Sequence, residues 1–490
     1  MATEEAAPAF SSGGRGQRDL TAGAIAPTLL AFALPTLGSN VLQSLNGSIN
    51  TIWVGRFLGE EALAATSNAN IIMFLMFGMV FGFGMAATIL VGQSWGRHDH
   101  DGARRAFGSA VGLVLIGSAL TAALGYLFAR DILTLLATPG GAYDEALAYL
   151  RVIFLGLPPS MLLVLIFMGL RGIGDSLTPL WFMGLSVVLD SALNPVFILG
   201  LGPAPALGIA GSATATLIAN IVSCGALLLY IRWRDLPLRL KGAEIGYIVP
   251  QPALVRVILS KGLPIGAQML VISTAGLTMV GLVNRHGVDV TAAYGITQQL
   301  WTYVQMPAMA IGAAVSAMAA QNIGARRWDR VSAITRSGIL FNLLITGAVI
   351  AVAWMFDRAL LSLFAASDSR VIPIAQHINA VVSWAFMLFG VTMVVFGTVR
   401  ANGAVWGPLA ILFVSMFPVR LGAVALLRPI LGLDALWWAF PISLLTSMSL
   451  SLLYYWRGTW RKGELTVADP RGCEERSHAD VEPVGVVKPA

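Results

Sequence analysis

Apolar residues fill most of this chain in long runs, and short polar segments separate the runs. A helix that crosses a ~30 Å hydrocarbon layer needs ~20 apolar residues. The pattern predicts twelve such helices, over residues 24–54, 63–93, 107–129, 147–170, 179–201, 208–231, 258–283, 290–320, 337–356, 377–399, 408–427 and 434–456. We therefore expect an all-α integral membrane protein. The even number of crossings places both chain ends on one side.

The two halves of the chain repeat each other. Matching pairs, at an offset of 229 or 228 residues, are Pro35 with Pro264, 171–180 with 400–409, Gln93 with Gln321, and Gly96 with Gly324. Each half holds an even number of crossings, so both halves start on the same face and the repeat is parallel. We expect two six-helix lobes with a central cleft between them, an architecture typical of transporters.

The predicted division of the chain follows from this repeat. It comprises a cytoplasmic tail (1–20), an N-lobe with helices 1–6 (21–232), a cytoplasmic linker (233–257), a C-lobe with helices 7–12 (258–456) and a disordered cytoplasmic tail (457–490).

Charge then orients the protein in the membrane. Only 11% of the residues are charged, and the net charge of +6 comes from lysines and arginines in short loops. Of the 31 basic residues, 23 are predicted on the side that both ends share, and eight, Arg420 among them, on the other. This bias predicts cytoplasmic termini in the cell inner (plasma) membrane. We expect a monomer that contacts small organic molecules and membrane lipid, but no nucleic acid.

One carboxylate lies in the middle of a predicted membrane-spanning helix. Asp190 is flanked by eleven residues on each side within 179–201. A charged side chain at the bilayer centre costs at least ~2.5–3.5 kcal/mol, so such residues are usually functional. Ser186 and Asn194 share its helix face at i−4 and i+4. We interpret this face as a proton or cation site; the alternative is a protonated aspartate that only joins two helices.

The first predicted helix carries a second polar stripe. Gln43, Asn46 and Asn50 lie on one face, and amides on an apolar helix need partners from another helix or from water. We expect the stripe to line a cavity, although helix packing would also satisfy it. Pro35 interrupts this helix and Pro264 its counterpart, and each can act as a hinge or as a fixed kink.

The second half of the chain carries no carboxylate inside its predicted helices. Its eighth helix instead has Tyr294, Gln298 and Trp301 at helical spacing, which predicts a neutral aromatic wall for amphipathic or cationic ligands. No nucleotide-binding, metal-enzyme or nucleophile motif is present in the sequence. We expect neither an enzyme nor a cofactor.

Four stretches resemble the multidrug and toxic compound extrusion (MATE) family of secondary transporters. They are residues 49–65, 171–179, 194–200 and 207–213. The resemblance implies two lobes of six helices and antiport of drug-like, often cationic compounds against protons or sodium.

The family's cation site is built from the first and fifth helices. The matching positions here are Asn50, Asp190 and Asn194, and the resemblance also places Gln43 in the cavity. The proton-coupled prokaryotic branch has Asp at the position of Asn50, and Asn then Asp at positions 190 and 194. This chain keeps one acid there, and it lacks the acids of the sodium-coupled branch in helices seven and ten. Proton coupling is favoured, and Na⁺ at Asp190 stays open.

Two alternatives come from outside drug export. A flippase for lipid-linked precursors would be expected to have a basic central cavity, whereas the predicted helices carry almost no lysine or arginine. A non-transporting scaffold or receptor would leave Asp190 and the stripe of the first helix without a ligand.

Overall fold

The computed structural model describes residues 18–135, 143–201, 205–362 and 370–462, and only the backbone of residues 59–77 and 79. Every regular element in these ranges is helical. Eleven helices in them are long and apolar enough to cross a bilayer. Most of the predicted tails, residues 1–17 and 463–490, lies outside the described residues.

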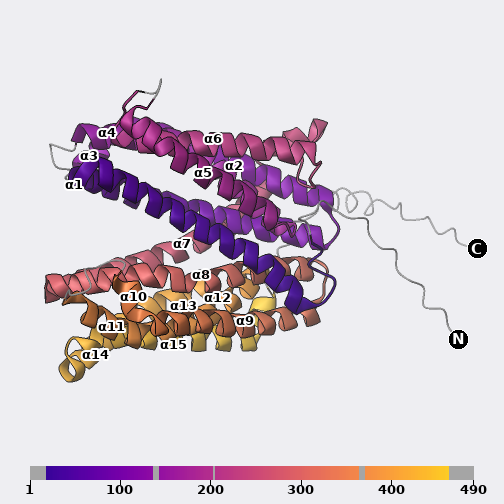
Figure 1. Cartoon of the computed structure of the whole chain (residues 1–490). Coiled ribbons are helices and arrows are strands. Elements are labelled where there is room, and N and C mark those ends of the chain that lie inside the picture. Colours follow the sequence, from indigo (N-terminus) through magenta and orange to yellow (C-terminus); the bar gives the residue numbers. More distant parts are fainter. Residues whose placement is uncertain (1–17, 136–142, 202–204, 363–369, 463–490) are drawn as a thin grey trace, which may run out of the picture.

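The N-lobe contains six helices (Figure 1). They are α1 (Ile25–Gly96), α2 (His100–Leu127), α3 (Ala129–Leu135), α4 (Tyr143–Gly172), α5 (Leu177–Leu199) and α6 (Ile209–Trp233).

The described part of the C-lobe contains nine α-helices. They are α7 (Pro252–Val283), α8 (Val288–Gly324), α9 (Trp328–Met355), α10 (Asp357–Ser362), α11 (Val371–Val382), α12 (Phe386–Ala401), α13 (Trp406–Val414), α14 (Arg420–Leu431) and α15 (Asp434–Arg457). Two pairs act as single crossings, because α11 and α12 join into Val371–Ala401 and α13 and α14 into Trp406–Leu431.

α1 accounts for two crossings. A straight helix of 72 residues would be ~108 Å long. Both ends of α1 nevertheless lie beside the same end of α8: Asn322 donates to the carbonyl of Leu20, just before α1, and Gly96 packs on Gln321. The chain therefore reverses within α1, and Ile25–Leu58 is followed by a returning crossing. The structure confirms the predicted all-α membrane fold with two lobes of six crossings.

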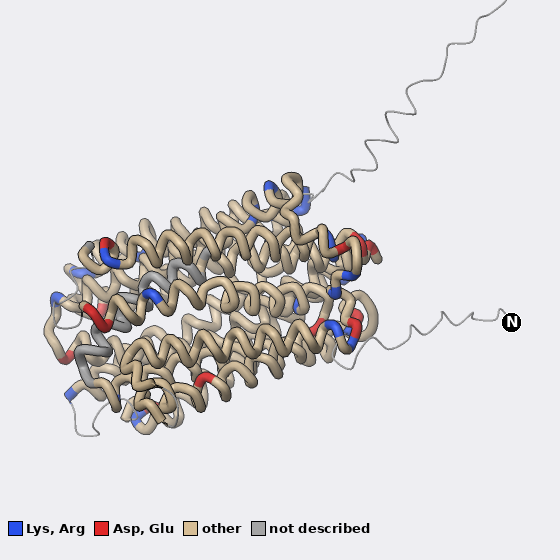
Figure 2. The backbone as a smooth tube through the Cα atoms, turned by 90° about the horizontal axis from the view of Figure 1, so that it is seen from above, with Lys and Arg blue, Asp and Glu red and all other residues tan. Residues whose placement is uncertain are grey.

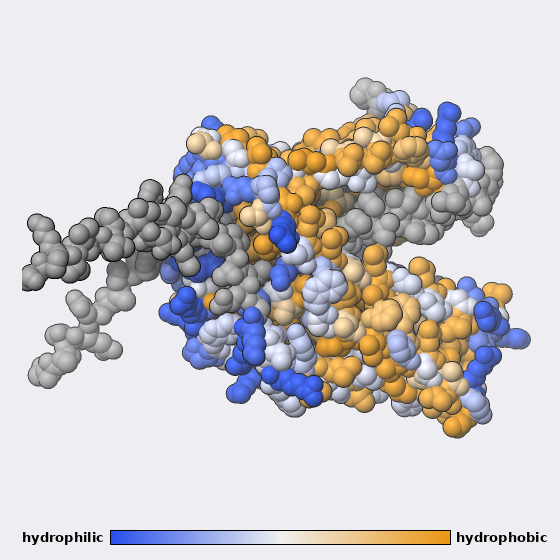
Figure 3. Space-filling view, turned by 180° about the vertical axis from the view of Figure 1, so that it is seen from behind, coloured by the Kyte–Doolittle hydropathy of each residue, from blue (hydrophilic) through white to orange (hydrophobic). Residues whose placement is uncertain are grey.

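The lobes separate at one end of the molecule. Figure 1 shows them diverging at the end where α3 and α14 lie, and Figure 3 shows a hollow between them at that end. Charged positions gather at the two ends of the bundle and leave the middle mostly uncharged (Figure 2). This distribution fits a protein whose middle lies in lipid.

Two matching hydrogen bonds join the lobes at the opposite end, which we call the closed end. Gln93 in α1 donates through Nε2 to the carbonyl of Ala401, at 2.7 Å. Its repeat counterpart Gln321 in α8 donates through Nε2 to the carbonyl of Gly172, at 2.8 Å. Both glutamines are buried. The parallel repeat thus places one buried amide from each lobe on the end of a helix in the other lobe.

Glycines allow the backbones of the two lobes to touch, both at the closed end and further along α1 and α7. A Cβ atom at Gly82 would collide with the backbone of Gly262 in α7, and one at Gly96 would collide with the carbonyl of Gln321. Gly324, the counterpart of Gly96, meets the N-lobe backbone in the same way. Small residues are the usual means by which membrane helices approach closely.

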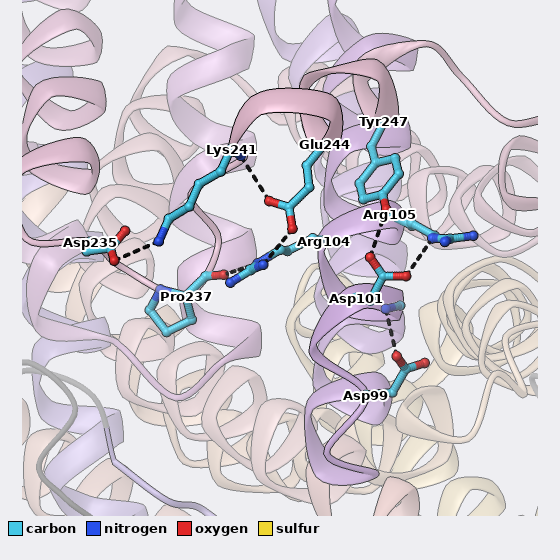
Figure 4. Close-up of polar contacts among 10 residues, drawn as sticks. Asp99, Asp101, Arg104, Arg105, Asp235, Pro237, Lys241, Glu244 and Tyr247 are labelled. Atoms are coloured by element: carbon cyan, nitrogen blue, oxygen red, sulfur yellow. Dashed lines mark hydrogen bonds and ion pairs between the residues drawn. The ribbon is translucent and has the colours of Figure 1, made fainter.

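The linker between the lobes is held against the start of α2 (Figure 4). Arg104 pairs with Glu244 at 2.7 Å, and Tyr247 donates to Asp101 at 2.8 Å. Outside the membrane-spanning segments, the hydrogen bond from Lys241 lowers the pKa of the Asp235 carboxyl group. These contacts fix the connection between α6 and α7 on the N-lobe.

We expect Gly82→Ala to destabilise the protein, because its methyl group forces the lobes apart where α1 touches α7. Overpacking of this kind costs ~1–3 kcal/mol. The control is Gly117→Ala in α2, where nothing lies within 4 Å of the added atom. Thermal unfolding in detergent should show a lower melting temperature for Gly82→Ala alone. Equal melting temperatures for the two variants would contradict the tight contact.

Candidate functional site

Asp190 is positioned by α5, whose first turn is fixed by another acid. The carboxylate of Asp175 accepts hydrogen bonds from the backbone N–H groups of Leu177 and Thr178, at 3.1 and 3.0 Å. These are donors that a helix start leaves without partners. From that start, the predicted polar face of α5 is buried: Asp190 is 1% exposed and Asn194 0%.

The carboxylate of Asp190 is surrounded by neutral hydrogen-bond donors from three helices. Asn50 Nδ2 in α1 donates to Oδ2 at 2.9 Å. Thr216 Oγ1 in α6 donates to Oδ1 at 2.9 Å, and Asn194 Nδ2 lies 3.2 Å from the same oxygen. In the described part of the chain, no lysine, arginine or histidine forms an ion pair with it. The three predicted residues Asn50, Asp190 and Asn194 therefore form one site.

The amides of the site also bind each other. Asn194 Nδ2 donates to Asn50 Oδ1 at 2.8 Å. The side chain of Asn46, one turn before Asn50, also faces the Asp190 carboxylate. Two buried side-chain oxygens in this cluster, Asn46 Oδ1 and Asn194 Oδ1, have no partner among the described residues. They are oxygen atoms that a water molecule or a small cation could use.

Sequence reasoning missed the contribution of α6. Thr216 bonds directly to Asp190, and Asn220, one turn later, accepts a hydrogen bond from Ser186 at 3.0 Å and donates to Ser160 at 2.8 Å. The i, i+4 spacing of these two polar residues in an otherwise apolar run could have predicted that this helix contributes to the site. The polar cluster therefore extends through α4, α5 and α6 inside the N-lobe.

The site can hold one proton or one monovalent cation. A carboxylate with only neutral partners changes its charge on binding either ion, and burial makes that change energetically large. Among the described residues, no group of three or more His, Cys, Asp or Glu side chains could hold a metal ion. A site for Na⁺ would depend on Asp190 together with amide and hydroxyl oxygens.

The residues that were predicted to line one substrate cavity lie in different parts of the structure. Gln43, expected to line it, is exposed on α1, and Asn46 belongs to the Asp190 cluster. Tyr294, Gln298 and Trp301 do line one cavity of about 410 Å³, but it lies within the C-lobe. A volume in this range is usual for a small-molecule site.

Arg420 corrects two sequence expectations. It was counted among the outer-loop arginines, and the second-half wall was predicted to be neutral. The structure places Arg420 at the start of α14, inside the crossing Trp406–Leu431, where it is 4% exposed and lines the same C-lobe cavity. Its position inside the predicted span 408–427 could have shown that it lies within the membrane.

The two predicted hinge prolines lie inside continuous helices, because α1 runs through Pro35 and α7 through Pro264. Both side chains are buried. The hydroxyl of Ser39 donates to the carbonyl of Pro35 at 3.0 Å. Their role as hinges stays a prediction.

Comparison with known proteins identifies the family. The MatE family model matches the chain twice, over residues 35–196 and 264–424, with the 229-residue offset of the repeat between the two starts. The "Probable multidrug resistance protein YoeA" of Bacillus subtilis is 34% identical over 438 residues, covering 89% of this chain and 94% of the relative. The "Probable multidrug resistance protein YpnP" of the same organism is 30% identical over 453 residues, covering 91% and 98%.

A solved structure shows the same fold. It is described as the outward-facing conformation of a multidrug resistance MATE family transporter, and it superposes with a TM-score of 0.84 at 20% identity, covering 92% of this chain and all of that one. The chain therefore belongs to the MATE family of multidrug efflux transporters, and it is a membrane transporter rather than an enzyme.

Proposed function

We propose that the protein is a proton-coupled antiporter that exports drug-like, often cationic, organic compounds across the cytoplasmic membrane by alternating access. One observation carries the proposal: Asp190 is a buried carboxylate inside a membrane-spanning helix, and among the described residues only neutral donors contact it. Such a group is an ion site by default. The printed names of the relatives, which describe multidrug resistance proteins, support the substrate class.

The donor arrangement favours a proton over sodium. Nitrogen and hydroxyl donors already contact both carboxylate oxygens of Asp190, through Asn50, Thr216 and Asn194. A sodium ion needs several oxygen ligands at once, so these amides would have to rotate to present their oxygens. A proton needs only one carboxylate oxygen.

Coupling requires that the ion bind the two conformations of the protein with different affinity. A proton on Asp190 removes the charge that the Asn50 and Thr216 donors stabilise, and these donors lie on α1 and α6. Protonation thus weakens the contacts that hold α1 against α5 and α6. Alternating access would also separate Gln93 and Gln321 from their partners in the other lobe.

The orientation follows from charge. Arg420 was counted in the outer loops but lies inside a crossing. The excess of basic residues on the side of the closed end is therefore larger than the sequence predicted. We therefore place the closed end and both termini in the cytoplasm, with the hollow of Figure 3 facing outward. A monomer suffices for this mechanism, because the two lobes of one chain enclose the cleft.

We expect Asp190→Asn to abolish ion-driven transport, because the amide cannot carry a proton. Uptake of the cationic dye ethidium into inside-out vesicles is measured under a proton gradient and, separately, under a sodium gradient. Wild type should take up dye under the proton gradient, and Asp190→Asn at equal protein level should not.

The control for this experiment is Asp289→Asn, which changes an exposed acid in the first turn of α8. It should leave uptake unchanged. Proton-driven uptake that survives in Asp190→Asn would remove this carboxylate from the mechanism, and uptake driven only by sodium would overturn the choice of ion.

Thr216→Val should destabilise the N-lobe, since it removes a donor from a buried carboxylate. Hydrogen bonds between membrane helices contribute ~0.6–1.7 kcal/mol. Thr214→Val is the matched control, because the Thr214 hydroxyl bonds only to the carbonyl of Ala210 in its own helix. Thermal unfolding of the two variants is compared with wild type. A Thr216→Val variant as stable as Thr214→Val would show that Thr216 does not support Asp190.

A further inference from the structure

The C-lobe cavity contains a cation that the proposed proton site does not use. Arg420 is 4% exposed within a membrane-spanning segment, where a charged side chain is costly unless it is paired or functional. Its Nε donates to Ser443 Oγ at 3.0 Å, and its guanidinium carbon lies 4.4 Å from the centre of the Phe440 ring. Both contacts are with neutral groups, so the charge has no counter-ion among the described residues of the C-lobe.

The acids of the described C-lobe are engaged or exposed elsewhere. Asp434 pairs with His377 at 2.9 Å, Asp357 accepts a hydrogen bond from Asn379 at 3.0 Å, and Asp289 is exposed at the start of α8. In the described part of the chain, Arg420 forms no ion pair, and its two terminal amino groups make no hydrogen bond. A planar guanidinium with both amino groups free matches the two oxygens of a carboxylate or phosphate.

The local backbone directs this side chain. The crossing that carries Arg420 is interrupted by a π-helical turn, Ser415–Val419, which contains Pro418 and directly precedes Arg420. Turns of this kind are frequent at functional sites, because they change which way the following side chains point. Ser415 Oγ, buried in this turn, has no partner among the described residues. The crossing that carries Arg420 therefore holds a second polar group, the Ser415 hydroxyl, without a partner among the described residues.

Aromatic rings form the rest of the cavity wall. Trp301 lies 6.0 Å from Tyr294 and 5.5 Å from Phe440, measured between ring centres, and all three rings line the cavity with Arg420. Gln298, which donates to the Tyr294 hydroxyl at 3.1 Å, adds an amide. A flat aromatic ligand could stack here while an acidic group reaches the guanidinium.

We propose that Arg420 determines specificity in this cavity, because its guanidinium binds the anionic oxygens of an aromatic substrate. The inference rests on the proposed export function and names the residue of this chain that recognises an acidic group on the substrate. A lipid phosphate has the same chemistry as a carboxylate at a guanidinium, and the experiment below separates the two.

The test is equilibrium binding of two dyes that differ in one group. Rhodamine 110 carries a free carboxylate, and rhodamine 123 is its methyl ester. Fluorescence polarisation measures the binding of each dye to purified protein in phosphatidylcholine nanodiscs. Wild type should bind rhodamine 110 more tightly than rhodamine 123. Equal binding, or tighter binding of the ester, would overturn the proposal.

Arg420→Gln should weaken rhodamine 110 binding by about 10- to 100-fold, as expected for loss of a charged hydrogen-bond pair, and should not weaken the binding of the cationic ester rhodamine 123. Retained binding of the ester also shows that the variant is folded. Arg428→Gln, which changes an exposed arginine on the same helix, should affect neither dye. Equal weakening of both dyes by Arg420→Gln, or no weakening, would show that Arg420 is only structural.

Arg420→Lys provides a second variant, since it keeps the charge and loses the planar fork. Its binding of rhodamine 110 should fall between those of wild type and Arg420→Gln. Nanodiscs that contain phosphatidylglycerol test the lipid: loss of rhodamine 110 binding there, with rhodamine 123 unaffected, would assign the site to lipid phosphate and overturn the substrate assignment. Because binding needs no ion gradient, failure here is distinct from a failure of ion-driven ethidium uptake.

Discussion

A polar group buried in this protein is costly unless it finds a partner without help from bulk water, and this constraint governs both lobes. Asp190 meets it with donors from α1, α5 and α6. A carboxylate satisfied in this way ties three helices to one ionisable group, so a change in its charge alters the contacts of all three. The proposed coupling mechanism is a direct consequence of that arrangement.

The two halves of the repeat make the same contacts at the closed end and differ in their interiors. At the closed end both lobes do the same thing: Gln93 and Gln321 occupy equivalent positions and each binds a carbonyl of the other lobe. In the interior they differ: the N-lobe buries the acid Asp190 and the C-lobe the base Arg420, and neither forms an ion pair among the described residues. Equivalent backbones thus carry the proposed ion site in one lobe and an aromatic cavity in the other.

Sequence alone predicted the fold well, because helix length and apolar runs are local properties that a bilayer enforces. It also predicted that Asn50, Asp190 and Asn194 meet, through spacing on α5 and a family resemblance. It did not predict that Thr216 binds Asp190, because the partner of a buried group depends on how neighbouring helices are rotated. The same reason explains Arg420, whose inward direction depends on the π-helical turn Ser415–Val419.

The central claim is that Asp190 carries a proton that exchanges when substrate binds. Infrared difference spectroscopy of the purified protein tests it directly, through the C=O stretching band of a protonated carboxyl group before and after ethidium is added. The account predicts that wild type loses this band on binding ethidium and that Asp190→Asn shows no such loss. The same loss in both proteins would contradict it, because the exchanging proton would then belong to another group.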